Sequence, residues 1–263
     1  MPNFGYLALS IHHRFGLRMA RYFIELAYNG AGYSGWQRQP DAPSVQEAVE
    51  KGISALLGAP HEIVGAGRTD AGVHAAFAVA HFDTAVAAER VLDPRFVYHL
   101  NCVLPKDIAI RNIYAVPDAK HARFDARRRE YKYYITTVKD PFATGTAWQI
   151  TQPLDVDAMQ TAAVSLMRYE DFTSFAKLHS DNRTNRCTIF GASWQTDGRR
   201  LVFTIAADRF LRGMVRAVVG TLVDVGRGKM TPAQFCAVIE SESRSEASAQ
   251  APAHGLFLTD VQY

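Results

Sequence analysis

The segment GAGRTDAGVHA, residues 65–75, carries Arg68, Asp70 and His74 among three glycines. Glycine permits tight backbone bends, so we expect a loop here. A carboxylate held on such a loop beside a cation can act as a nucleophile or a base. The alternative is an ordinary turn in which Asp70 caps backbone N–H groups, and the residues by themselves leave both interpretations open.

Two phosphate-binding motifs do not fit this segment. In a dinucleotide-binding fingerprint the third glycine would come two positions before Gly72. In a Walker motif, Lys and Ser or Thr would stand in place of Val73 and His74. A metal site made by Asp70, His74 and His81 is a weak alternative because no spacing identifies a metal, and His74 is more simply a packing histidine that makes hydrogen bonds.

The sequence on either side of the segment predicts strands and helices in both halves of the chain. Ser44 and Glu47 form a capping box that opens a helix ending at Gly58. The turn at 196–198 joins two strands in a hairpin. The expected strands are 22–28, 62–64, 79–83, 108–116, 130–138, 187–195, 201–206 and 256–261; the other expected helices are 89–100, 157–169, 212–224 and one that begins at Thr231.

These elements predict an α+β protein with two halves of similar make-up and a cleft between them. We place a leader at 1–18, an N-terminal α/β subdomain containing the glycine-rich loop at 19–122, and a C-terminal α/β subdomain at 123–263. The leader lacks the charge order and the cleavage site of a secretory signal. Met19 is therefore an alternative start, and the leader is expected to be dispensable.

Composition indicates a globular protein of a reducing compartment. The 263 residues are 48% hydrophobic and 21% charged, and no stretch reaches the roughly 18 apolar residues of a membrane span. Cys102, Cys187 and Cys236 have no paired spacing, which argues against a disulfide framework and against a cysteine zinc site. We therefore expect a soluble, cytoplasmic protein.

The distribution of charge is more informative than its sum. The formal net charge of +3 does not by itself indicate a polyanionic partner. Basic residues gather at 120–139 and 209–229, however, where Tyr131 and Phe210 lie among them. Cations mixed with aromatic rings suit phosphate contact and base stacking, as in RNA-binding proteins, whereas a solvated face is the alternative for either run alone.

A longer pattern links these features to a known family. AGRTDAGVHA, residues 66–75, resembles at every position the signature segment of the TruA family of tRNA pseudouridine synthases. Ten consecutive matches are far more specific than a lone glycine motif. The resemblance continues, in the family's order, through YNGAGYSGWQRQP (28–40), SVQE (44–47), HARFDARRREYKY (121–133), DFTSF (171–175), FLRGMVRAVVGTLVDVGRG (210–228) and GLFL (255–258).

The resemblance implies both a fold and a reaction. The implied fold has two similar α/β subdomains whose mixed, mostly antiparallel sheets form one continuous sheet, with helices on one side and an RNA-binding active-site cleft on the other. The implied reaction is isomerisation of uridine to pseudouridine at positions 38, 39 and 40 of the tRNA anticodon stem-loop, with neither metal nor organic cofactor. A homodimer that binds no DNA and no membrane is implied as well.

The resemblance also implies roles for single residues. Asp70 corresponds to the catalytic nucleophile of the family, and attack at ribose C1′ and attack at uracil C6 both remain open. The implied substrate-binding residues are Tyr131, which packs against the target base, Arg68, which assists extrusion of the nucleotide, Arg216, which pairs with the aspartate, and Leu256 and Leu258, in the segment that closes the pocket.

Two departures from the family pattern put local RNA contacts in doubt. Phe77-Ala78 stands where the family commonly has Gly-Gln, and Arg212-Gly213 replaces bulkier or amide residues. Two other classes of function also have to be tested. One is a non-catalytic RNA-binding protein or tRNA chaperone on the same fold, and the other is a metal-dependent hydrolase that uses Asp70, His74 and His81.

Overall fold

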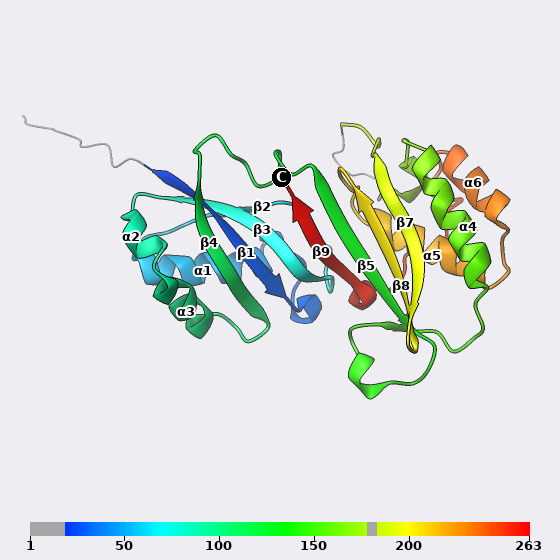
Figure 1. Ribbon diagram of the computed structural model, residues 1–263, viewed down its shortest axis with the longest axis horizontal. Helices are drawn as coiled ribbons and strands as arrows, with labels where there is room; N and C mark the ends of the chain where they lie inside the picture. Colours follow the sequence, from blue (N-terminus) through cyan, green and yellow to red (C-terminus); the bar gives the residue numbers. More distant parts are fainter. Residues whose placement is uncertain (1–18, 178–182) are drawn as a thin grey trace, which may run out of the picture.

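The computed structural model describes residues 19–177 and 183–263, and the expected leader at 1–18 lies outside the described residues. The described residues form one nine-stranded sheet with helices, which confirms the predicted α+β class (Figure 1). The strands are β1 Ala20–Tyr28, β2 Ile63–Gly65, β3 His74–Thr84, β4 Ile108–Val116, β5 Arg128–Thr136, β6 Trp148–Gln149, β7 Ile189–Asp197, β8 Arg200–Ala207 and β9 Leu256–Gln262.

The C-terminal strand joins the two halves of the sheet. The strand order is β4-β1-β3-β9-β5-β8-β7, with β2 on β3 and β6 on β5. β9 lies parallel to β3, with Leu258 opposite Ala75, and antiparallel to β5, with Leu258 opposite Tyr131. All other pairs except β5–β6 are antiparallel. The sheet is therefore continuous, mixed and mostly antiparallel, as the resemblance implied.

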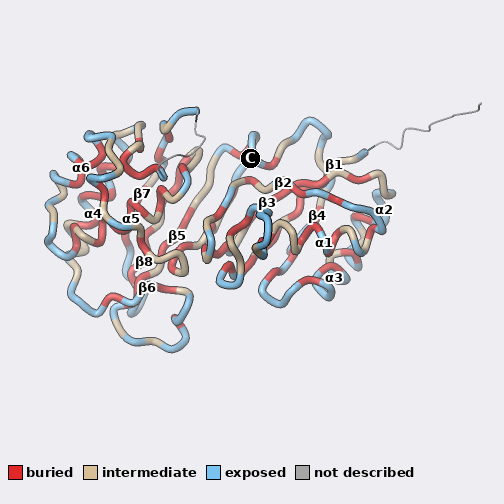
Figure 2. Tube along the Cα trace, turned by 180° about the vertical axis from the view of Figure 1, so that it is seen from behind, coloured by how far each residue is buried: buried red, intermediate tan, exposed pale blue. Residues whose placement is uncertain are grey.

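Helices α1 and α5 run behind the sheet in Figure 1 and face the viewer in Figure 2, where buried segments follow the strands and the inner sides of the helices. In the described parts of the chain, no helix has the length and apolar character needed to cross a bilayer. The α-helices are α1 Val45–Leu57, α2 Ala88–Val91, α3 Pro94–Val103, α4 Val156–Ser165, α5 Met214–Gly226 and α6 Pro232–Glu240. The 3-10 helices are η1 Gly30–Gly32, η2 Pro141–Ala143, η3 Leu166–Arg168, η4 Thr173–Phe175 and η5 Ala253–Gly255.

Local chemistry accounts for the helix ends that the sequence predicted. Ser44 Oγ accepts a hydrogen bond from the Glu47 amide at 3.3 Å, and α1 ends where Gly58 adopts a left-handed φ of 79°. Thr231 caps α6 with both hydrogen bonds of a capping box. Both predicted helix starts are confirmed.

Three predicted elements differ from the structure. The helix expected at 89–100 is two helices, α2 and α3, because Pro94 disfavours a helical residue before it and Asp93 caps the second helix instead. β3 begins at His74, so the glycine-rich loop is shorter than expected. The helix expected at 157–169 ends as α4 at Ser165, and the last turn is the 3-10 helix η3.

Candidate active site

The loop between β2 and β3 is held by the segment that follows β1. The Trp36 amide donates to Thr69 O at 3.2 Å, and the hydroxyls of Tyr28 and Thr69 lie 2.9 Å apart. Gly35 allows this approach, because its φ is 102° and a Cβ atom there would lie 2.5 Å from Thr69 O. Thr69 is buried, and the adjacent Asp70 is thereby fixed in position.

Two arginines of the second half face the Asp70 carboxylate. Arg216 Nη1 lies 3.8 Å from Oδ2, and Arg212 Nε lies 3.8 Å from Oδ1. Both distances are ion-pair rather than hydrogen-bond distances. Within residues 19–177 and 183–263 no group donates a hydrogen bond to this carboxylate, and its side chain is 25% exposed. The oxygens are therefore partly shielded from water, face two cations and are free to meet a substrate.

The first turn of α5 orients Arg216. Its Nε donates to Ala251 O at 2.7 Å, so the guanidinium is fixed at one side and points Nη1 toward Asp70. Gly213 precedes the helix with a φ of 72°, which favours glycine at this position. The departure at Arg212-Gly213 thus has a structural consequence, since it supplies a second cation to Asp70 on a turn that glycine permits.

Tyr131 lies on β5 with its ring buried beside the carboxylate. Only 9% of the residue is exposed, and the ring meets Phe210 edge-on at a centroid distance of 5.2 Å. Burial, and then the negative charge of Asp70, raise the pKa of the Tyr131 phenol. The phenol is therefore neutral at physiological pH. Leu258 is buried directly opposite Tyr131 in β9, and Leu256 two residues earlier is buried as well.

Arg68 is exposed, and among the described residues it makes no ion pair with Asp70, unlike Arg212 and Arg216. Its charge acts on Arg123 instead: partial burial, and then the charges of Arg68 and Arg209, lower the pKa of the Arg123 guanidinium. Arg68, Arg123 and Arg209 therefore form a cationic rim beside the loop, and a polyanion is the natural partner of such a rim.

Arg129 is a site residue that the sequence did not reveal. Its Nη2 donates to Ala66 O at 2.9 Å and to Arg123 O at 2.7 Å. Its Nη1 donates to Ala126 O at 2.9 Å and to Asp208 O at 2.6 Å. One guanidinium thus joins the start of the Asp70 loop to the segment before β5 and to the end of β8. No motif predicts such contacts, because all four acceptors are backbone carbonyls.

Arg129→Lys is expected to lower both stability and the rate of the chemical step. A single ammonium cannot bond four carbonyls from three segments, so we expect a loss of about 2 kcal/mol in the free energy of unfolding. We also expect at least a tenfold lower single-turnover rate (order of magnitude) at saturating substrate. Urea unfolding and single-turnover kinetics measure the two effects. Arg128→Lys is the control, because Arg128 lies on the opposite face in partly exposed ion pairs; an equal loss there would contradict the prediction.

The structure does not bring together the histidines of the metal-site alternative with Asp70. His74 Nδ1 accepts from the Gly30 amide at 3.0 Å, and its Nε2 lies 3.1 Å from both Gly145 O and His254 O. His81 Nδ1 accepts from the Ala122 amide at 3.1 Å. Among the described residues there is no cluster of three or more metal-ligating side chains. His74 is a buried, hydrogen-bonded histidine on β3.

His81 makes stability depend on pH. Burial, followed by the charges of Arg21 and His121, lowers the pKa of His81 to about 4, and the charge of Asp83 opposes this. The unfolded chain then binds the proton more tightly than the native state. The contribution to stability is complete above about pH 6.5 and is lost as the pH falls toward 4, by about 2 kcal/mol over that window.

His81→Asn is expected to flatten this pH dependence, since an amide oxygen can accept from Ala122 without titrating. Urea unfolding between pH 7.5 and pH 4.5 measures the effect. Parallel pH profiles for the wild type and the variant would assign the acid sensitivity to other groups.

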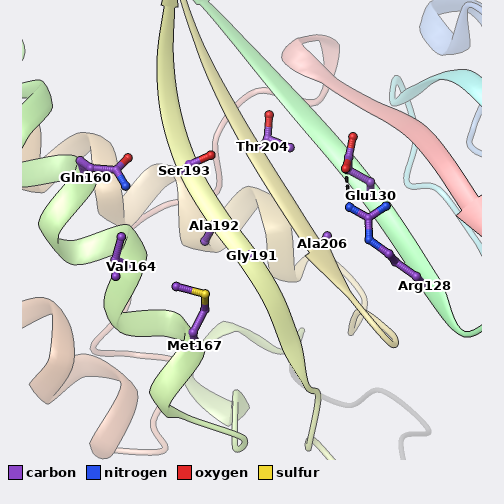
Figure 3. Close-up of a pocket in the computed structure, with 10 residues that line it drawn as sticks. All are labelled: Arg128, Glu130, Gln160, Val164, Met167, Gly191, Ala192, Ser193, Thr204 and Ala206. Atoms are coloured by element: carbon purple, nitrogen blue, oxygen red, sulfur yellow. Dashed lines mark hydrogen bonds and ion pairs between the residues drawn. The ribbon is translucent and has the colours of Figure 1, made fainter.

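A hollow on the other face of the sheet is a competing location for a site (Figure 3). Its volume is about 360 Å³. Successive side chains of β5 point to opposite faces of the sheet, so Tyr131 is buried on one face while Arg128 and Glu130 line the hollow on the other. The carboxylate of Glu130 is already bonded, at 2.6 Å to Arg128 and at 3.2 Å to Thr259 Oγ1. The carboxylate that lines the hollow is therefore already bonded, unlike that of Asp70.

The candidate site lies on the face of the sheet that carries the helices. Arg216 belongs to α5, which runs behind the sheet in Figure 1, and it pairs with Asp70. Tyr131 and Leu258 lie on β5 and β9, where the two halves of the sheet meet. The structure brings together Asp70, Arg216, Tyr131 and Leu258, whereas Leu256 lies opposite Tyr133 on β5 and Arg68 lies at the rim.

Comparison with known proteins gives one consistent result. A family model described as tRNA pseudouridine synthase matches residues 162–263. The tRNA pseudouridine synthase A of Parabacteroides distasonis is 51% identical over 246 residues, which are 93% of this chain and 96% of that protein. The proteins of the same name from Bacteroides fragilis and Porphyromonas gingivalis are 50% and 52% identical, over 94% and 93% of this chain and 98% of each relative.

Proposed function

Because the chain belongs to the tRNA pseudouridine synthase A family, it is an isomerase of tRNA uridines, and we propose that Asp70 is its nucleophile. Isomerisation breaks the bond from ribose C1′ to uracil N1 and forms a bond from C1′ to C5. The C5 proton leaves and N1 gains a proton, so no electrons are exchanged with a cofactor. The ionised carboxylate adds either to C1′ or to C6 and is released when the new bond is complete.

The observation that carries this proposal is the placement of Asp70 between Arg216 and Arg212 and beside the buried ring of Tyr131. Arg216 and Arg212 place two positive charges beside the attacking oxygens in a partly dry site. The Tyr131 ring offers one wall of a slot for a flat base, and Leu258 shields the same wall from water. A uridine must leave its stack to reach this slot, at a cost of a few kcal/mol.

We further propose that the target uridines are those at positions 38, 39 and 40 of the anticodon stem-loop. The resemblance of residues 66–75 to the family signature supports this proposal, and so does the cationic rim of Arg68, Arg123 and Arg209, which suits a phosphate backbone. A homodimer in the cytoplasm, acting without metal or organic cofactor, completes the proposal.

Tritium release from C5-labelled uridine tests the position. An unmodified tRNA transcript with uridine at 38, 39 and 40 should release tritium, and a transcript with cytidine at all three positions should release none. Equal release from both transcripts would place the target elsewhere in the tRNA.

The same assay tests the two other classes of function. Tritium release that survives exhaustive EDTA treatment would exclude the metal-dependent hydrolase. Tight tRNA binding without tritium release would favour the RNA chaperone.

A further inference from the structure

Phe124 is a large apolar side chain left almost entirely in water. It is 76% exposed, in the connection between β4 and β5 beside the C-terminus (Figure 1). A ring that is 76% exposed contributes little to folding, because most of its apolar surface stays in water. Such a side chain is explained more readily by a binding partner than by the fold.

The segment that carries Phe124 is held rigidly. His121 Nδ1 faces the amides of Arg123 and Phe124 at 3.1 and 3.3 Å, and the His121 amide donates to Asp125 Oδ2 at 2.8 Å. Arg129 Nη2 holds Arg123 O, and the Tyr263 hydroxyl donates to Ala122 O. The ring is therefore presented in a fixed direction, so little conformational entropy is lost when a partner binds.

Phe124 is also the outer member of a row of three rings. The ring centroids of His81 and His121 lie 4.6 Å apart with the rings edge-on at 67°, and those of His121 and Phe124 lie 4.2 Å apart with an interplanar angle of 31°. Arg123 Cζ lies 5.8 Å from the centre of the Phe124 ring. The row ends in solvent at the 76% exposed Phe124 ring, where a flat base can pack beside the Arg123 guanidinium that already lies over this ring.

The cationic rim shows which kind of partner fits. Arg123, next to Phe124, is in the electrostatic field of Arg68 and Arg209. Arg129 Nη2 bonds both Arg123 O and Ala66 O, so these two carbonyls lie side by side. Ala66 is only four residues from Asp70, at most about 15 Å of chain. A ligand with phosphates and flat bases, extending to the Asp70 site, matches these features better than a protein surface does.

We propose that Phe124 is a stacking platform for an unpaired base of the bound tRNA, one close to the target uridine. The inference rests on the proposed function, because it assumes that the same tRNA occupies the Asp70 site. Phe124 contributes affinity and placement, and it takes no part in the bond exchange.

Substitution of Phe124 tests the platform by separating affinity from chemistry. For Phe124→Ala we expect about tenfold weaker binding of an unmodified tRNA transcript. We expect the single-turnover rate at saturating tRNA to stay within about twofold. Phe124→Trp should bind within about threefold of the wild type, because an indole also stacks. The thermal unfolding midpoint should not change, since the ring is exposed.

Two comparisons make the test specific. Phe142→Ala is the matched control, because Phe142 is 92% exposed on η2, beyond the opposite end of β5, and its loss should leave affinity within about twofold. Phe124→Ala should keep the salt dependence of binding, whereas Arg123→Gln should reduce its slope by about 0.7 to 0.9. Equal affinity losses for Phe124→Ala and Phe142→Ala would overturn the proposal.

The experiments can disprove the stacking platform and the proposed reaction independently of each other. Titration of the full chain with transcript measures binding without turnover, and transcript-induced quenching of the added indole in Phe124→Trp, beyond that of the wild type, would support stacking. A wild type that binds transcripts but releases no tritium would defeat the proposed function alone. A Phe124→Ala variant that instead changes the oligomeric state in sedimentation would overturn the platform and make Phe124 a protein contact.

Discussion

Asp70→Asn is expected to abolish tritium release from unmodified tRNA while tRNA binding is retained. The amide keeps the size and shape of the side chain, but it cannot form the covalent bond that the proposed mechanism requires. We expect a loss of at least roughly 10⁴-fold in the single-turnover rate. Binding should remain within about threefold, or become slightly tighter, because a carboxylate repels the phosphates of the RNA.

The control for this prediction is Asp197→Asn, since Asp197 is an exposed carboxylate at the end of β7 that contacts no part of the site. It should release tritium at the wild-type rate. Urea unfolding of Asp70→Asn should show an intact fold, because no hydrogen bond among the described residues ends on the Asp70 carboxylate. Tritium release by Asp70→Asn above one hundredth of the wild-type rate (an order-of-magnitude limit) would remove Asp70 from the role of nucleophile.

The fold was predictable from the sequence where local chemistry determines structure. The capping residues at Ser44 and Thr231 and the turn at Gly198 placed two helices and a hairpin correctly. Element ends that depend on partners were not predictable. β6 has only two residues and exists through its pairing with β5, and β3 extends back to His74 because β9 pairs with it there.

The site was predictable only as far as the family resemblance reaches. It implied Asp70, Tyr131 and Arg216, which the structure brings together from a loop, a strand and a helix. It gave no reason to expect Arg129, whose acceptors are backbone carbonyls. Arg212 entered only as a departure, because pairing it with Asp70 requires the long-range approach of α5 to the glycine-rich loop.

Arg216 and Arg212 provide an internal comparison of how burial changes the effect of a charge. Each lies 3.8 Å from one Asp70 oxygen, but the Arg216 side chain is 20% exposed and that of Arg212 is 63% exposed. At about 4 Å two unit charges interact by roughly 1 kcal/mol in water and roughly 4 kcal/mol near a protein surface of lower dielectric. The shielded arginine should therefore account for most of the stabilisation of the attacking carboxylate.

We accordingly expect Arg216→Gln to lower the single-turnover rate about 10²- to 10³-fold and Arg212→Gln to lower it about fivefold. The Arg212 effect should fade between about 0.05 and 0.5 M salt, because an exposed pair is screened, whereas the Arg216 effect should persist. Arg216→Lys keeps the charge but loses the planar fork that bonds Ala251 O while facing Asp70, so it should recover only part of the rate. Losses of equal size and equal salt dependence at the two positions would show that both arginines act on tRNA phosphates rather than on Asp70.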